Sequence, residues 1–192
     1  MDRTGIRVPF GYEPPEETSK GTLLIYDSFD LGDDEDNPSP VAGDWLDRQG
    51  LAELAGWAER RFISRVVWYV PHEETLKRMG VRYPAPMYKR EEALREAADS
   101  IRSGVRTEID TWERKRKKYT PMDTALRYME ERYKGPYFLG LSEGTANRFA
   151  SYQDFEEWIR KIRLVVAAGP EFQPHPHLGK HAARWNAATK RE

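Results

Sequence analysis

The sequence predicts an α+β fold: a predominantly helical single domain with a small sheet, an extended acidic N-terminal arm and a basic C-terminal tail. Three observations support this prediction. An apolar stripe with helical spacing runs from Leu94 to Trp112. The runs 22–27 and 63–70 have the β-branched and aromatic composition of strands, and 137–141 is a third candidate. Acidic residues are concentrated near the N-terminus.

The charge pattern and the prolines divide the 192 residues into three parts. Residues 1–40, with Pro9, Pro14 and Pro15, are expected to form an extended acidic arm with one short strand. Residues 41–169 are expected to form a helix-rich core domain, and 170–192 a basic tail containing prolines and histidines. The arm carries a net charge of -7 and the rest of the chain +6. This separation favours contacts between the two parts, within one molecule or between neighbours.

Helical periodicity predicts each core helix in turn. Apolar residues from Leu51 to Ala58 predict a helix over 47–61, and a short helix begins at Pro71 and stops at Gly80. The stripe through Leu94 predicts one helix of about 28 residues from position 89. Further helices are expected from 121 to 135 and from 151 to 169, each ending at a Gly-Pro pair.

Composition excludes several classes of protein. Cysteine is absent, which excludes disulfides, thiolate catalysis and cysteine-ligated metals. The first residues lack a secretory signal pattern, and no apolar run approaches the roughly 20 residues that a bilayer requires. We therefore expect a soluble protein with no membrane contact, located in the cytoplasm or in a virion.

One pentapeptide, Gly140-Leu141-Ser142-Glu143-Gly144, has the G-x-S-x-G pattern and resembles the nucleophile elbow of α/β-hydrolases. The resemblance implies a Ser142 nucleophile, with Asp154 and one downstream histidine completing a triad. The elbow needs a parallel sheet built before it, and residues 1–139 supply two convincing strands amid long helices. We therefore expect a loop with two turn glycines and no catalytic residue.

Metal and cofactor sites are not expected either. His175, His177 and His181 could converge on one ion, yet a proline-rich tail offers nothing to orient their imidazoles. A calcium loop starting at Asp33 would place Pro38 where glycine is required. Phosphate-binding glycine motifs and H-E-x-x-H do not occur in the sequence.

The residues expected to bind partners are charged or aromatic. They are the basic block Arg114, Lys115, Arg116, Lys117 and Lys118, its flanking Trp112 and Tyr119, the acidic group Asp33, Asp34, Glu35 and Asp36, and Trp185 on the tail. We further expect the acidic segment 27–36 to dock on the basic block.

The first functional hypothesis is a non-enzymatic structural or interaction subunit of a homo- or hetero-oligomer, built by analogy like a phage or virion component. A nucleic-acid-binding or regulatory protein that uses the basic block is the alternative. A small serine hydrolase that uses Ser142 is the third hypothesis.

Overall fold

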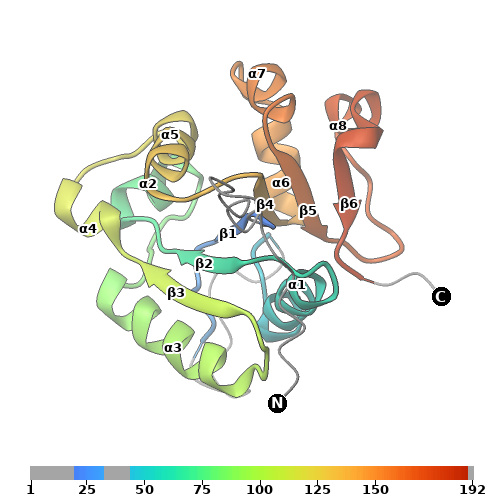
Figure 1. Ribbon diagram of the computed structural model, residues 1–192. Helices are drawn as coiled ribbons and strands as arrows, with labels where there is room; N and C mark the ends of the chain where they lie inside the picture. The colour runs from blue at the N-terminus through green and yellow to red at the C-terminus, as the bar shows by residue number, and fades with distance from the viewer. Residues whose placement is uncertain (1–19, 33–43, 190–192) are drawn as a thin grey trace, which may run out of the picture.

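The computed structural model describes residues 20–32 and 44–189. Within these ranges, six strands form one parallel sheet in the order β3-β2-β1-β4-β5-β6 (Figure 1). The strands are β1 (Thr22–Tyr26), β2 (Arg65–Tyr69), β3 (Arg106–Asp110), β4 (Tyr137–Ser142), β5 (Arg163–Ala167) and β6 (Trp185–Ala187). The fold is therefore a doubly wound α/β fold, and the prediction of a predominantly helical domain with a small sheet is wrong.

Helices cover both faces of the sheet. They are α1 (Arg48–Arg60), α2 (Glu73–Arg78), α3 (Met87–Ser100), α4 (Trp112–Arg116), α5 (Met122–Arg132), α6 (Glu143–Ala150), α7 (Phe155–Ile159) and α8 (Pro176–Lys180). Helices α1 and α3 pack on the face that Leu23 and Ile25 present. Helices α5 to α8 pack on the opposite face, with Leu24 and Tyr26. Alternate residues of β1 thus enter different cores, because successive side chains of a strand point to opposite faces.

The predicted long helix from position 89 is wrong, because α3 ends at Ser100 and the chain then forms β3 and α4. The apolar stripe does not distinguish the two structures. Val105 and Ile109 are four residues apart, a spacing that suits one face of a helix and also one face of a strand. Ser103 and Gly104, between them and α3, are where the regular structure changes.

The predicted last helix over 151–169 is wrong for a related reason. Helix α7 is short, and Leu164, Val165 and Val166 form the centre of strand β5. All three are fully buried, because a central strand of a parallel sheet has a core on both faces. Such a continuous apolar run has no period that separates strand from helix. Beyond it, the expected tail contributes α8 and the edge strand β6.

Other predicted elements are confirmed. The strands at 22–27, 63–70 and 137–141 correspond to β1, β2 and β4, and the helices at 47–61 and 121–135 correspond to α1 and α5. Gly21, just before β1, has a φ of 101°, and a Cβ there would lie 2.2 Å from the carbonyl oxygen of Pro136. Glycine is thus required where β1 meets β4. None of the helices described is long and apolar enough to cross a membrane.

A buried arginine joins the strand ends of β1 and β2. Arg90, in the first turn of α3, is 1% exposed. Its guanidinium donates hydrogen bonds to the carbonyl oxygens of Ser28 at 3.0 Å, Pro71 at 2.8 Å and Ala85 at 2.8 Å. The carboxylate of Glu73 lies 3.6 Å away and balances its charge. The loops that follow β1 and β2 are therefore held against the same helix.

We expect Arg90→Met to lower the free energy of unfolding by about 3 to 5 kcal/mol, because it leaves buried carbonyl groups and Glu73 without their partner. Arg95→Ala, on the same helix with a side chain 61% exposed, is the matched control and should change stability by less than about 0.5 kcal/mol. Urea unfolding followed by circular dichroism measures both. Equal effects of the two substitutions would contradict the role given to Arg90.

Candidate functional site

The strand order places a crevice between β1 and β4. Connections from β1 lead to one side of the sheet and those from β4 to the other, so the helices that follow these strands lie on opposite faces. The position between β1 and β4, where the strand order reverses, is the topological switch point of the sheet. In open α/β sheets, ligands bind at this switch point, in the crevice outside the carboxyl ends of the strands. Here those ends are Tyr26-Asp27 and Ser142-Glu143.

Both strand ends hold the same short segment. The carboxylate of Asp27 accepts hydrogen bonds from the backbone N–H of Leu46 at 2.9 Å and of Phe29 at 2.9 Å. The hydroxyl of Ser142 donates to the carbonyl oxygen of Asp44 at 2.7 Å. Residues 44–46 are thereby tied across the switch point. Trp45 lies between the two anchored residues and packs against the core next to α6.

Glycine at position 144 allows this close approach. A Cβ there would lie 2.8 Å from the carbonyl oxygen of Asp44 and 3.1 Å from its Cα. Backbone atoms cannot move aside as a flexible side chain can, so a larger residue would displace the segment. The second glycine of the G-x-S-x-G pattern is therefore explained by packing between α6 and residues 44–46.

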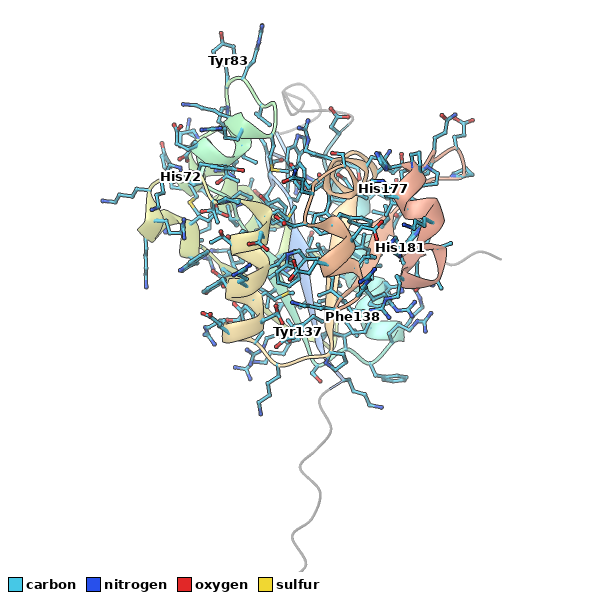
Figure 2. All side chains as sticks on the ribbon, turned by 90° about the horizontal axis from the view of Figure 1, so that it is seen from above. His72, Tyr83, Tyr137, Phe138, His177 and His181 are labelled. Atoms are coloured by element: carbon cyan, nitrogen blue, oxygen red, sulfur yellow. The ribbon has the colours of Figure 1, made fainter. Side chains whose placement is uncertain are left out.

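A cleft of about 730 Å³ opens beside these anchors. One wall is formed by the 44–45 segment and α6, and the other by the loop after α2. Its lining residues are Asp44, Trp45, Met79, Gly80, Val81, Arg82, Tyr83, Gly144, Thr145, Asn147, Arg148 and Ser151. Tyr83 is 84% exposed and projects from one end of the molecule (Figure 2).

Two cations face this cleft, one from each wall. Arg82 follows α2, and Arg148 lies on α6 with its guanidinium close to Gly80. Within residues 20–32 and 44–189, neither arginine forms an ion pair. Among the described residues that line the cleft, Asp44 is the acidic one. The first turn of α6, at Gly144 and Thr145, adds the positive end of a helix dipole.

Two buried carboxyl groups lie near the same edge of the sheet. Burial raises the pKa of Asp27 from 3.8 to about 7, although the hydrogen bonds from Leu46 and Phe29 oppose the shift. Burial also raises the pKa of Glu113, on α4. Glu113 accepts hydrogen bonds from the Tyr69 hydroxyl at 2.5 Å and the Thr75 hydroxyl at 2.6 Å. These bonds fix α4, and with it the basic block, against β2 and α2.

The structure places Ser142 in a strand-to-helix turn, where it is the N-cap of α6. The parallel sheet that the sequence reasoning found missing is present, so that argument against a hydrolase is wrong. The backbone of Ser142 is ordinary extended chain, with φ -71° and ψ 166°, whereas a nucleophile elbow is strained. Its hydroxyl is 3.0 Å from that of Thr145 and accepts the Thr145 N–H at 3.2 Å. That Ser142 is not a nucleophile stays a prediction.

The three histidines lie at the two ends of α8 and within it. The Nδ1 of His175 accepts the His177 N–H at 3.1 Å, and the Nδ1 of His177 lies 2.7 Å from the carbonyl oxygen of Ala150. His181 lies 3.3 Å from the carboxylate of Glu156. Figure 2 shows His177 and His181 together on one side and His72 on the other. In the described ranges no three His, Cys, Asp or Glu side chains are grouped as metal ligands.

The basic block forms α4 and the turn after it. Arg114 pairs with Glu91, and Arg116 lies 5.1 Å above the ring of Trp112. Lys115, Lys117 and Lys118 are exposed, as is Tyr119. The expected partner acids Asp33, Asp34, Glu35 and Asp36 lie outside the described residues, so their docking on the block stays a prediction.

Trp185 belongs to strand β6, where its indole N–H donates to the carbonyl oxygen of Leu178 at 2.9 Å. Its ring also contacts Phe172 edge to face. This tryptophan is half-buried within the chain.

Sequence reasoning missed the residues that form the cleft. Arg82 lies just beyond the short helix that was expected to stop at Gly80, Arg148 follows the Ser142 pentapeptide, and neither arginine belongs to a motif. Asp27 does carry a signal, because it follows the buried run Thr22-Leu23-Leu24-Ile25-Tyr26 directly. A polar residue at the end of a buried parallel strand is expected at a binding edge, once the sheet is known to be parallel.

No known protein family matches this chain, and a search of curated proteins finds no significant match.

We expect the stability of the protein to fall as pH rises from about 4 to about 7, because folded Asp27 keeps a proton that the unfolded chain releases. The contribution of Asp27 to the free energy of unfolding is largest below the pKa that Asp27 has in the unfolded chain, and it has been lost above about pH 7. Through this one group, the free energy of unfolding changes by at most about 1.4 kcal/mol per pH unit.

Asp27→Asn should remove this part of the pH dependence, while Glu113 contributes to wild type and variant alike. Urea unfolding of both proteins at about pH 5 and about pH 8 measures the difference. Parallel pH profiles would show that Asp27 does not titrate in this range.

Proposed function

We propose that the protein binds a small anionic ligand, bearing a phosphate or carboxylate group, in the cleft at the β1/β4 switch point. The observation that carries the proposal is the position of Arg82 and Arg148 on opposite walls of that cleft. Arginine presents its donors in a planar fork that matches the oxygens of such groups.

The surroundings favour one anionic group over a dinucleotide. The turn after β1 lacks the glycine-rich fingerprint of dinucleotide-binding folds, and the β1–α1 connection is long. The turn after β4 reads Ser142-Glu143-Gly144-Thr145, and its hydroxyl groups bond to each other. What remains for a ligand is the arginine pair, the helix end and the exposed ring of Tyr83, on which a flat group could stack.

The volume supports a ligand of limited size. Pockets for small molecules commonly enclose about 300 to 1,000 Å³, and the cleft of about 730 Å³ lies within this range. The roles deduced from the sequence alone, as an assembly subunit, as a nucleic-acid-binding protein that uses the basic block, or as a hydrolase, stay predictions.

The test is a thermal-shift screen with inorganic phosphate, pyrophosphate, sugar phosphates, mononucleotides and dicarboxylates, followed by calorimetry with the best ligand. We expect Arg148→Ala and Arg82→Ala each to weaken binding about tenfold or more, because each removes a charge-assisted hydrogen bond.

Arg127→Ala is the matched control, since its side chain on α5 is 66% exposed and does not line the cleft. It should leave the affinity unchanged. No stabilisation of the wild type by any of these anions, or equal losses in all three variants, would overturn the proposal.

A further inference from the structure

The edge of the sheet opposite the cleft carries a row of basic residues. Strands β2, β3 and β5 each begin with an arginine, and a base closely precedes each of the other strands. In spatial order across the sheet these residues are Arg106, Arg65, Lys20, Lys134, Arg163 and Arg184. Because all strands are parallel, their amino-terminal ends lie together at one end of the sheet, which we call the amino edge, and the bases form a row there.

Half of this row, three of its six bases, is available to an external anion. Lys20, Arg106 and Lys134 are exposed, and within the described part of the chain none of them forms an ion pair. Arg65 pairs with Glu108 at 3.1 Å. Arg184 is occupied, because it donates to carbonyl oxygens at the end of α7. The row from β3 to β5 spans about 19 Å, at about 4.8 Å per strand.

Helix dipoles account for only part of the row, such as Lys134, which lies two residues beyond the end of α5. Bases are favoured in the last turn of a helix, where the dipole is negative, and the effect falls off beyond that turn. Arg65 lies five residues beyond the end of α1, and Arg106 lies six residues beyond the end of α3. The placement of Arg65 and Arg106 at strand starts thus needs another explanation.

A cleft of about 500 Å³ lies in the middle of this edge. Lys20, Arg61 and Arg163 line it, and none of the described residues that line it is acidic. Trp57 and Phe138 form its apolar wall, with ring centres 5.3 Å apart. Figure 2 shows Phe138 and Tyr137 toward the end of the molecule opposite Tyr83, so this cleft is separate from the switch-point cleft.

An exposed aromatic ring stands next to this cleft. Phe62 follows Arg61 directly and is 76% exposed. Its φ is 56°, a left-handed conformation that is strained for a bulky residue and that glycine adopts freely. The chain thus has a phenylalanine, with its ring in solvent, where glycine would suit the backbone better.

We propose that this amino edge binds single-stranded nucleic acid. A strand of phosphates matches a row of cations, and bases stack on aromatic rings without regard to sequence. Phe62 and the half-buried Phe138 supply such rings. An acidic protein segment would match the charges and would leave the exposed ring of Phe62 without a role. The proposal is independent of the basic block on α4 and of the ligand at the switch point.

The test is fluorescence anisotropy of a labelled oligothymidylate of about 15 nucleotides, titrated with the full chain at about 50 mM and about 200 mM salt. The triple variant Lys20→Ala, Arg61→Ala, Lys134→Ala should weaken binding at least tenfold at low salt. It should also reduce the salt slope by about 2, at about 0.7 per lost phosphate contact on a single strand.

The matched control is Lys115→Ala, Lys117→Ala, Lys118→Ala, which removes the same charge from the basic block. It should leave affinity within about twofold, and Arg148→Ala should also leave it unchanged, which separates this edge from the switch-point cleft. Phe62→Gly should weaken binding about fivefold or more without lowering thermal stability, because the ring stacks on a base and its backbone strain is relieved.

Three outcomes would overturn the proposal. The wild type does not bind the oligonucleotide at low salt, or the two triple variants lose affinity equally. In the third, polyglutamate competes as well as unlabelled oligonucleotide at equal charge and Phe62→Gly has no effect, which would assign the edge to an acidic protein.

Discussion

The geometry at the carboxyl ends of β1 and β2 depends on the hydrogen bonds that the buried guanidinium of Arg90 donates. Its donors satisfy carbonyl groups after β1 and after β2, so two adjacent strand ends and α3 cannot move independently. Burial lowers the pKa of Arg90, and the charge of Glu73 opposes that shift. Asp27 directly precedes one of these carbonyls, at Ser28. The position of Asp27 therefore depends on Arg90, and the position of residues 44–46 depends on Asp27. The buried charge of Arg90 is in turn stabilised by the carbonyl oxygens and by Glu73.

Composition and hydrophobic spacing predicted several elements well, and they failed where the spacing of apolar residues fits both a helix and a strand. Strand β1 and helix α1 have clear composition and spacing, and both lie within one or two residues of the predicted bounds. Strand β3 was assigned to a helix because Val105, just before the strand, and Ile109 within it are four positions apart, and β5 because its residues after Arg163 are all apolar. Both errors have the same origin. A strand that is stabilised by its neighbours across the sheet need not show an alternating pattern of its own.

The cleft could not be predicted for a different reason. Arg82 and Arg148 are far apart in the sequence, and they face one space only because the loop after α2 and helix α6 lie on opposite walls of one cleft. The Ser142 pentapeptide was visible in the sequence, and its chemistry depends on backbone angles that a pattern does not specify. Ser142 and Gly144 fit a capping and packing role in every contact that the structure describes.

Parallel topology also determines where the charges of the chain are placed. A base at a strand start is an ordinary local feature, and in an antiparallel sheet such bases would alternate between the two edges. Here all strands run one way, so the same local feature becomes a row at the amino edge. The five residues of β1 separate this edge from the switch-point cleft by about 17 Å, beyond a Debye length of about 8 Å in physiological salt. A polyanion at one edge would therefore influence the other by moving strands, and the tight packing of β1 between both cores opposes such movement.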